Sequence, residues 1–349
     1  EIVTGDWSSD VCSSDLIPKK YGGMGLSLIE FSQISSILGS SPVGLYLFNC
    51  QAPDAGNMEI LIEYGTKYQK DKFLKPLLEG KIRSCFSMTE PNHAGSNPVF
   101  MSTTAIKKND SYLINGRKWY TSSAEGSSFA IVMAISNPNE KNKYLTASQI
   151  IVPTDLKGFN LIRKIPVMGE EGEGYFSHSE IEYNNVTVPK ENLLGKEGFG
   201  FKIAQSRLGP GRIHHCMRWI GICERSFDMM CKRAASRELS PGNFLGQKQL
   251  IHKMIAERRV EINAAKLLVM EVGRKIEKKG SKESRFDISM IKFYCANILK
   301  RVIDDAIQIH GGLGMSDDII LSHFYRHERA ARIYDGADEV HITNVAKGV

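Results

Sequence analysis

Apolar positions follow a helical period along the first part of the chain. From about Leu26 to Gly80 they recur at helical spacing, with short breaks at 40–42 and at Gly65. The stretch LIEYGTKYQKDKFLKPLLEG shows the pattern clearly, because lysines separate its recurring apolar residues. We therefore expect the folded chain to begin with a block of helices.

Between Cys85 and about Val188 the pattern changes to one typical of β-strands. The stretch SYLINGRKWYTSS carries Asn115–Gly116 between two β-rich runs, and this pair is the strongest short-range signal for a hairpin turn. The stretches SSFAIVMAIS, ASQIIVPTD and HSEIEYNNVTV continue as strands that polar turns separate. The middle of the chain is therefore predicted to form an antiparallel β block.

After Gly200 the helical period returns and is kept. In IAERRVEINAAKLLVMEVGRKIEKKG four apolar residues recur every seven positions, at Ile255, Ile262, Val269 and Ile276. The segment 290–309 repeats this pattern, which is that of a long helix in a bundle. The order of helices, strands and helices predicts an α+β fold in three parts.

Composition excludes some classes of protein and leaves others open. The 349 residues are 42% hydrophobic and 24% charged, as in ordinary globular proteins, and no apolar run is long enough to cross a bilayer. The net charge of +6 comes from scattered basic residues, so it is only a weak signal for phosphorylated ligands or nucleic acid. The seven cysteines form no CxxC pair or disulfide framework, which favours a reducing, intracellular compartment.

The first residues differ from the rest of the chain. GDWSSDVCSSDL, from Gly5 to Leu16, is rich in Ser and Asp, has no period, and resembles a one-frame translation of a sequencing-library adapter. We interpret residues 1–16 as an artefact of cloning or assembly, the alternative being a disordered polar tail. The natural N-terminus is then expected to be missing, so a leader peptide cannot be judged.

Two short segments of the β block have the composition of ligand-binding loops. CFSMTEPNHAGSNP, residues 85–98, runs from a strand into a turn that exposes backbone N–H groups and hydroxyls, which can bind a phosphate or the edge of a heteroaromatic ring. A plain turn is the alternative. In GRKWYTSSA, residues 116–124, strand alternation predicts Trp119 and Thr121 on one side and Tyr120 and Ser122 on the other. That face suits a flat cofactor, although a cross-strand aromatic pair explains it equally well.

Two segments near the C-terminus contain glycines beside chemically active residues. QIHGGLGM, residues 308–315, closes a long helix, and its glycines permit a left-handed cap and close approach of the backbone to a ligand. In RIYDGADEVHITN, residues 332–344, Asp335, Asp338 and Glu339 are either parts of a helix cap or include a general base. The pair His214–His215 invites a metal reading. However, neighbouring helical residues point about 100° apart, so packing or pocket lining is favoured and no metal is expected.

Taken in their order along the chain, these motifs resemble those of the acyl-CoA dehydrogenase family. The match consists of TEP…GS, NGRKWYTS, QIHGGLG and YDGADEVH, and IPKKYGGMG is similar to the family's N-terminal motif. The resemblance covers residues 17–349. The stretch LGPGRIHHCMRWIG is similar to one branch, whose animal members are fused to a phosphotransferase-like domain and act on long-chain acyl-CoAs.

The resemblance implies the fold of the family. An N-terminal helical domain, here truncated, would span 17–83 and a middle antiparallel β-barrel-like domain 84–195. A C-terminal four-helix bundle would span 196–349.

The resemblance also implies FAD as the cofactor and assigns residues to it. The positions that match flavin contacts are Phe86, Met88, Thr89, Tyr120 and Ser122. Those that match contacts to the FAD diphosphate and adenosine are Arg237 (from a neighbouring subunit), Gln308, Gly312 and Glu339. Ser96 and Arg212 match contacts to the CoA part of the substrate. The stretch SRELSPGNFLGQKQ departs from the family pattern by one extra residue and by lacking its Phe-Gly pair.

Asp335 stands where most of the family has the catalytic glutamate, one methylene longer. The implied reaction is α,β-dehydrogenation of an acyl-CoA, in which Asp335 removes the α-proton and its backbone N–H helps to polarise the carbonyl. Electrons would pass to an electron-transfer flavoprotein, and the protein would be a homodimer or homotetramer. The expected location is the cytoplasm in a bacterium, and otherwise an organelle of fatty-acid oxidation.

Two other readings remain open. The first is a flavin oxidase of the same fold acting on an acyl-CoA or a nitroalkane, because nitroalkane-oxidising relatives also use aspartate as the base. The second is a basic, DNA-binding flavoprotein, which ranks behind the other two because such relatives carry an added C-terminal domain. No nucleic acid and no membrane insertion is expected.

Overall fold

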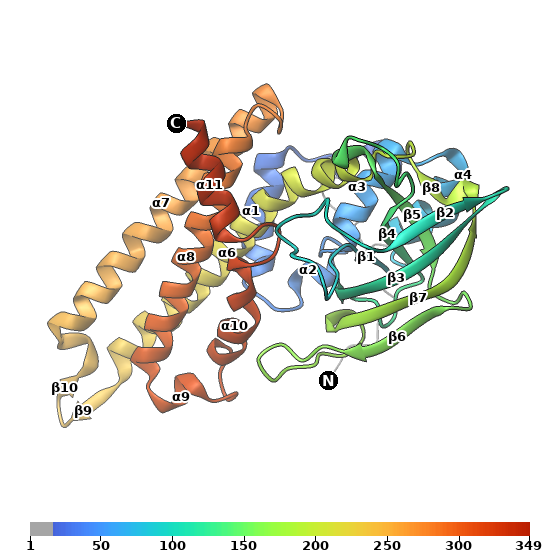
Figure 1. The fold of residues 1–349 in the computed structure, drawn as a ribbon. Helices are drawn as coiled ribbons and strands as arrows, with labels where there is room; N and C mark the ends of the chain where they lie inside the picture. The colour runs from blue at the N-terminus through green and yellow to red at the C-terminus, as the bar shows by residue number, and fades with distance from the viewer. Residues whose placement is uncertain (1–16) are drawn as a thin grey trace. The chain divides into compact units, whose positions relative to one another are not determined.

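The computed structural model describes residues 17–349, and of residues 208–210 only the backbone. The predicted artefact at 1–16 lies outside the described residues. The chain forms two compact units, the first containing 17–25 and 46–208 and the second 26–45 and 209–349 (Figure 1). The N-terminal helix α1 thus groups with the C-terminal helices, whereas the sequence prediction divided the chain into three consecutive domains.

The helices that precede the sheet in the first unit are short, and they follow the predicted breaks. They are η1 (Lys19–Tyr21), α3 (Asp54–Tyr64), α4 (Lys67–Gln69), a π-helical turn η2 (Lys70–Leu74) and α5 (Lys75–Leu78). Gly65 ends α3 with an extended backbone, and Thr66 caps α4 by accepting a hydrogen bond from the Gln69 N–H. The predicted break at Gly65 is therefore confirmed.

An eight-stranded sheet forms most of the first unit. Its strands are β1 (Ser84–Ser87), β2 (Thr104–Lys108), β3 (Ser111–Ser122), β4 (Phe129–Ile135), β5 (Ala147–Pro153), β6 (Phe159–Lys164), β7 (His178–Pro189) and β8 (Leu193–Leu194). They lie in the order β6-β7-β3-β2-β4-β5-β8, and β1 pairs with β4. The pairs are antiparallel except that β4 runs parallel to β1 and β2.

Strand β4 is buried on both faces, which explains its unbroken apolar sequence FAIVMAI. Ala130 and Val132 point into the core of the sheet, where they pack with residues of β3 and β7. Phe129 and Ile131 point the other way and pack against helices α3 and α5. One strand therefore joins the two larger apolar clusters of this unit.

The hairpin predicted at Asn115–Gly116 is wrong. The turn between β2 and β3 lies at residues 109–110, where Asn109 adopts a φ of 50°. Asn115 and Gly116 instead lie within β3, at a shift of register against β7. Gly116 has a φ of 151°, and a Cβ placed on it would lie 2.6 Å from the backbone of Thr103. The glycine therefore permits close approach of two chain segments rather than a turn.

The predicted alternation of residues 119–122 is also wrong. A second register shift lies between Lys118 and Thr121, and Tyr120 has a φ of 49°. Lys118 and Thr121, three positions apart, are consequently both fully buried, while Tyr120 is 48% exposed. At this bulge the Trp119 and Tyr120 rings pack edge to face, with their centroids 4.9 Å apart.

Helices make up the second unit, apart from one small hairpin. They are α1 (Leu28–Gly39), the part of α6 (Gly200–Ser236) from 209 onwards, η6 (Leu245–Gln247), α7 (Gln249–Lys279), α8 (Arg285–His310), α9 (Gly312–Met315), α10 (Leu321–Glu328), η7 (Arg329–Arg332) and α11 (Asp338–Gly348). The hairpin, β9 (Glu238–Ser240) and β10 (Asn243–Phe244), follows α6. The short helix α2 (Gly44–Leu47) lies at the boundary of the units.

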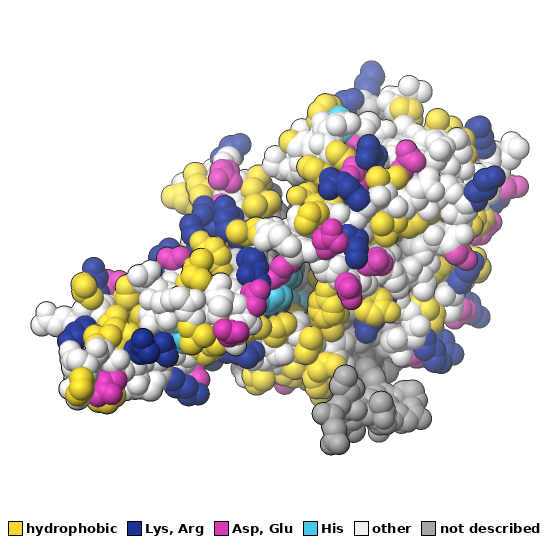
Figure 2. Space-filling model, turned by 90° about the horizontal axis from the view of Figure 1, so that it is seen from below, with side chains coloured by type: hydrophobic (Ala, Val, Ile, Leu, Met, Phe, Trp, Pro, Cys, Tyr) yellow, Lys and Arg dark blue, Asp and Glu magenta, His cyan; other side chains and the backbone are white. Residues whose placement is uncertain are grey.

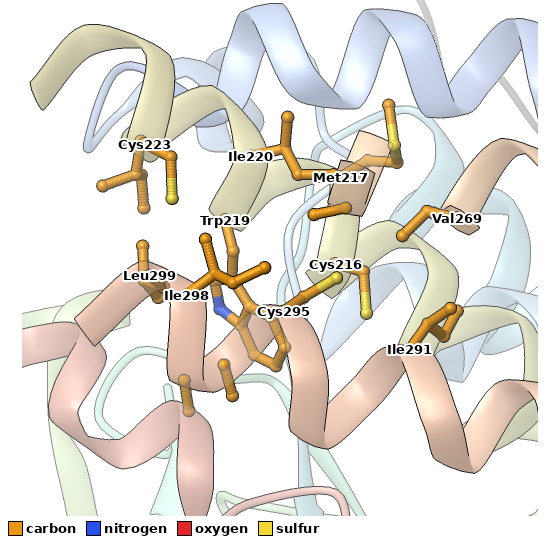
Figure 3. Packing of buried hydrophobic residues seen from close by; sticks show 14 of the residues in the cluster. Cys216, Met217, Trp219, Ile220, Cys223, Val269, Ile291, Cys295, Ile298 and Leu299 are labelled. Atoms are coloured by element: carbon orange, nitrogen blue, oxygen red, sulfur yellow. The ribbon is translucent and has the colours of Figure 1, made fainter. Parts of the chain in front are cut away.

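The predicted seven-residue spacing in α7 is confirmed as its buried face. Ile262, Val269 and Ile276 are buried, and Ile255 packs into a smaller neighbouring cluster. Figure 1 shows α7 and α8 side by side. In the core between the long helices, Trp219 and Cys216 of α6 lie near Cys295 and Ile298 of α8 (Figure 3).

Helix α1 packs so closely on α6 that side chains are excluded at the contact. A Cβ on Gly221 would overlap the carbonyl group of Ser36, and one on Gly39 would overlap Arg218. On the other side, the Ile29 N–H donates to the Glu277 carboxylate of α7 over 3.2 Å. No helix of residues 17–349 is both long and apolar enough to span a bilayer.

Replacing Gly116 by Ala tests whether close approach requires this glycine. We expect Gly116→Ala to lower the free energy of unfolding by about 2–4 kcal/mol, because strain at positive φ adds to a clash with Thr103. Gly80→Ala is the matched control. Gly80 also has a positive φ, of 67°, but a Cβ there would meet no atom within 4 Å, so a loss of only about 1 kcal/mol is expected. Both variants are measured by thermal and urea unfolding. If Gly116→Ala and Gly80→Ala lose the same free energy of unfolding, the close-approach argument is contradicted.

Candidate active site

The loop before α11 holds Asp335 in an unusual backbone conformation. Asp335 has a φ of 53°, and Gly336 follows with a φ of 100°. Aspartate is among the few residues other than glycine that adopt the left-handed region readily. A Cβ on Gly336 would lie 2.7 Å from the His341 ring, so a glycine is needed here.

Side chains from three helices hold the carbonyl groups of this turn. Arg212 Nε of α6 donates to the Asp335 oxygen over 3.1 Å, and His341 Nε2 of α11 lies 3.1 Å from the same atom. Lys292 Nζ of α8 donates to the Gly336 oxygen over 2.5 Å. Burial lowers the pKa of His341 to about 4 and that of Lys292 to about 8. His341 is therefore a neutral donor near pH 7.

The Asp335 carboxylate meets a histidine. His215 Nε2 of α6 lies 3.1 Å from Asp335 Oδ2, and the two side chains are each 20% exposed. The preceding residue, His214, points elsewhere and meets the Phe31 ring of α1 edge-on at 4.6 Å. The two histidines therefore diverge as their helical positions predicted.

Two other acids near this turn are committed to structural partners. Glu328 is 5% exposed, and its carboxylate binds the Arg218 guanidinium through two contacts, one of them Nη2 to Oε2 over 2.8 Å. Burial alone would raise the pKa of Glu328, but the Arg218 charge holds it well below its usual range. Asp338 is 2% exposed and accepts from Arg332 Nε over 2.6 Å and from Asn297 Nδ2 over 2.9 Å. Asp335 is the partly exposed acid of the three.

In the first unit, the loop after β1 is fastened to β3. Thr89 Oγ1 donates to the Trp119 oxygen over 2.9 Å, and the Trp119 N–H donates to the Thr89 oxygen over 3.0 Å. The fully buried Lys118 Nζ donates to the Met88 oxygen over 2.8 Å and to Glu90 Oε1 over 2.9 Å. Residues 88–90 therefore sit at a fixed place beside the exposed Tyr120 ring.

Glu90 is the centre of this arrangement. Its carboxylate also accepts from the backbone N–H groups of Ser102 (2.7 Å) and Thr103 (2.9 Å). Burial acts to raise the pKa of Glu90, but the Lys118 charge and these donors lower it to about 2. Burial lowers the pKa of Lys118 to about 8, so the pair is ionised at neutral pH.

The remaining predicted flavin contacts of the first unit lie close by along the chain. The Phe86 ring stacks under the Arg207 guanidinium at 4.4 Å, and Met88 packs beside Phe86 in a small apolar cluster. Ser122 Oγ lies 2.8 Å from His178 Nδ1. Ser96, a predicted CoA contact, is exposed on the loop whose residues 93–95 and 97–98 line a pocket together with Met88 and Met101.

The predicted contacts to the FAD diphosphate and adenosine occupy exposed positions near helix ends of the second unit. Arg237 follows α6 directly, and Gln308 lies in the last turn of α8. Gly312 begins α9, and Glu339 is the second residue of α11. Gly311, which separates α8 from α9, has the positive φ of 64° that the glycine-rich motif predicted. In this unit the turn brings Arg212 to Asp335, as described above.

Three family descriptions match successive parts of the chain. "Acyl-CoA dehydrogenase, N-terminal domain" matches residues 15–81, the middle domain 85–186, and the C-terminal domain 198–349. The chain belongs to the acyl-CoA dehydrogenase family. The predicted family and α+β fold are thereby confirmed.

Similar members of the acyl-CoA dehydrogenase family come from bacteria and animals. "Probable acyl-CoA dehydrogenase FadE2" of Mycobacterium tuberculosis is 44% identical over 93% of this chain and 79% of that protein. "Acyl-CoA dehydrogenase family member 11" of Gallus gallus is 43% identical over 92% of this chain, which spans only 42% of that protein. A solved structure of a Mycobacterium abscessus protein assigned to the acyl-CoA dehydrogenases is 38% identical, with a TM-score of 0.93 over 97% of this chain and 82% of that one.

Sequence reasoning missed several residues that shape these sites. Lys118 belongs to the quoted motif GRKWYTS and, with Tyr112 and Ile114, to the buried side of β3 at even positions, so alternation alone predicts its burial. Glu90 is the acid of the TEP motif. No local pattern connects His215 or Lys292 with Asp335, because they lie 120 and 43 positions before it in the chain. His341 lies in the quoted motif, six positions after Asp335, but the motif does not indicate its contact with the Asp335 carbonyl.

Removing the Lys118 charge should destabilise the first unit. Lys118→Met leaves the Glu90 carboxylate buried without its cation, and we expect the free energy of unfolding to fall by about 3–5 kcal/mol. The double variant Lys118→Met/Glu90→Gln removes both charges and should recover a large part of this loss. Urea unfolding of the wild type, both single variants and the double variant measures the coupling. Additive losses would show that the two charges act independently.

His214 should make the protein sensitive to acid. Burial lowers its pKa from 6.5 to about 3, so between these values the unfolded chain binds a proton that the folded chain does not. Stability therefore falls as pH drops below about 6.5, by about 1.4 kcal/mol per pH unit at most. His214→Leu should flatten this dependence between pH 6.5 and 4, when unfolding is followed in urea. An unchanged slope would mean that His214 takes up its proton in the folded state.

Proposed function

We propose that this chain catalyses the FAD-dependent α,β-dehydrogenation of an acyl-CoA thioester, with Asp335 as the base that removes the α-proton. The observation that carries the proposal is the turn at Asp335, which belongs to the family's C-terminal domain. Its carboxylate is partly exposed, whereas the nearby acids Glu328 and Asp338 are buried in ion pairs with arginines. Arg212 and Lys292 lie close enough to interact electrostatically with this carboxylate, and nearby cations favour its ionised form.

The residues of the first unit fit a flat cofactor. Tyr120 adopts a positive φ and is about half exposed, and hydrogen bonds from Lys118 and Trp119 hold the neighbouring loop of Met88 and Thr89. We assign Phe86, Met88, Thr89, Tyr120 and Ser122 to the flavin ring. We assign Arg237 (from a neighbouring subunit), Gln308, Gly312 and Glu339 to the rest of FAD. When bound, FAD supplies the acceptor for the hydride that leaves the β-carbon.

The protein's own groups have three tasks in this reaction. Asp335 takes the α-proton, and Gly336 allows the turn that aims its carboxylate and backbone N–H. Arg212 and His341 fix the Asp335 carbonyl, so the carboxylate works from a rigid backbone. Arg212 and Ser96 are further assigned to the CoA part of the substrate. Exclusion of water by the bound thioester would strengthen each of these interactions.

The finer identity of substrate and acceptor is part of the proposal. We propose a long-chain acyl-CoA as the substrate, because LGPGRIHHCMRWIG resembles the long-chain branch of the family. The chain is also similar to family member 11, although it spans less than half of that relative. An electron-transfer flavoprotein is the proposed acceptor, and a homodimer or homotetramer the proposed assembly. On the face shown in Figure 2, the described Lys and Arg side chains are interspersed with Asp and Glu, an arrangement that gives no support to duplex binding.

Anaerobic titration with acyl-CoAs of increasing chain length tests the proposal. Long-chain acyl-CoA should bleach the visible absorbance of bound FAD in the wild type, and Asp335→Asn should slow this reduction by at least about 100-fold while still binding the substrate. Asp304→Asn, an exposed aspartate on α8, is the matched control and should react normally. No bleaching by any acyl-CoA would overturn the proposal. Rapid reoxidation by oxygen would instead identify an oxidase.

A further inference from the structure

His215 is the side chain that meets the carboxylate of the proposed base. Its Nε2 lies 3.1 Å from Asp335 Oδ2, and it points in a different direction from His214, which meets Phe31. Since a carboxylate only accepts hydrogen bonds, Nε2 must carry the proton in this contact. The imidazole thus donates to Asp335, and donation to a carboxylate favours the ionised form that a base requires.

The imidazole is itself held in place by two aromatic rings. It stacks on Trp219, one helical turn further along α6, with centroids 5.9 Å apart and an angle of 25° between the planes. The second ring is that of Tyr334, whose centroid lies 5.2 Å from that of the imidazole. Trp219 Nε1 donates to Glu328 Oε2 and lies 3.0 Å from Tyr334 Oη, so the two rings share a hydrogen-bond network.

That network ends in the ion pair between Arg218 and the buried Glu328. Arg218 Nη2 donates to both Glu328 Oε2 and Tyr334 Oη over 2.8 Å. Tyr334 also precedes Asp335 in the chain. The ion pair is therefore connected to Asp335 in two ways. One is the backbone that follows Tyr334, and the other is the His215 ring stacked on Trp219. Because its neighbours fix the orientation of His215, His215 can fix the orientation of the Asp335 carboxylate.

We propose that His215 is a positioning residue for Asp335, which fixes the orientation of its carboxylate and keeps it ionised for proton abstraction. This inference rests on the proposed function. Aspartate is one methylene shorter than glutamate, and a fixed rotamer restricts where its oxygens can reach. The titratable and charged groups that face Asp335 come from α6, α8, the loop and α11; they are His215, Arg212, Lys292, Tyr334 and His341.

Substitutions at His215 separate donation from packing. Gln places an amide N–H near the position of Nε2, whereas Leu fills space without a donor. We expect His215→Leu to slow anaerobic flavin reduction on the order of 10- to 100-fold without weakening acyl-CoA binding. His215→Gln should recover most of the rate, and the control His214→Leu should leave it unchanged. The acid limb of the rate–pH profile should move to higher pH in His215→Leu, because the carboxylate has lost a donor.

A second measurement needs neither FAD nor substrate. Nitrogen-15 NMR of histidine-labelled protein, with the His215 signal assigned by its loss in His215→Gln, shows which ring nitrogen carries the proton. We expect a protonated Nε2 in the wild type and a changed signal in Asp335→Asn.

An unprotonated Nε2 at neutral pH would overturn the inference, as would equal rates for the Leu and Gln variants. If wild-type flavin is not reduced by any acyl-CoA while Nε2 is protonated and responds to Asp335→Asn, the proposed function fails and the contact between His215 and Asp335 stands.

Discussion

The ion pair between the partly exposed Arg218 and the buried Glu328 is the interaction on which the site of the second unit depends. A buried carboxylate is costly unless it is fully paired, and here a bidentate guanidinium, an indole N–H and a phenol satisfy it. Each of those partners then has a second role. Trp219 stacks on His215, the tilted Tyr334 ring packs against it, and Tyr334 leads directly into the turn at Asp335. The Glu328 charge does not contact Asp335 itself, but its partners Trp219 and Tyr334 hold His215 and the turn at Asp335 in place.

The first unit solves a similar problem with a different pair. Lys118 and Glu90 lie in the sheet, and the same contacts that neutralise them fasten the loop of Met88 and the start of β2. In both units a buried charge therefore organises irregular backbone next to an exposed functional group. Irregular backbone has few hydrogen bonds of its own, and a fixed charge supplies strong ones.

Regular elements and the base could be predicted from the sequence, while the groups that support the base could not. The spacing of Ile262, Val269 and Ile276 predicts a buried helix face because this signal is local. Asp335 stands out because a motif carries it. The pair Asn115–Gly116 misled the hairpin prediction, because a glycine that admits Thr103 has the same appearance in sequence as one that permits a turn. His215 and Lys292 meet Asp335 only through the packing of helices that lie far apart in the chain.

The close packing of α1 on α6 has a consequence for how the protein is made. The helix bundle needs residues 26–45, yet the rest of that bundle begins about 160 residues later in the sequence. During translation α1 leaves the ribosome long before α6, α7 and α8 exist, so its apolar face must wait without its partners while the sheet forms. A C-terminal fragment from 209 onwards would likewise expose the glycine surface at Gly221. The bundle is therefore completed late in synthesis, although α1 is made about 160 residues before the rest of it.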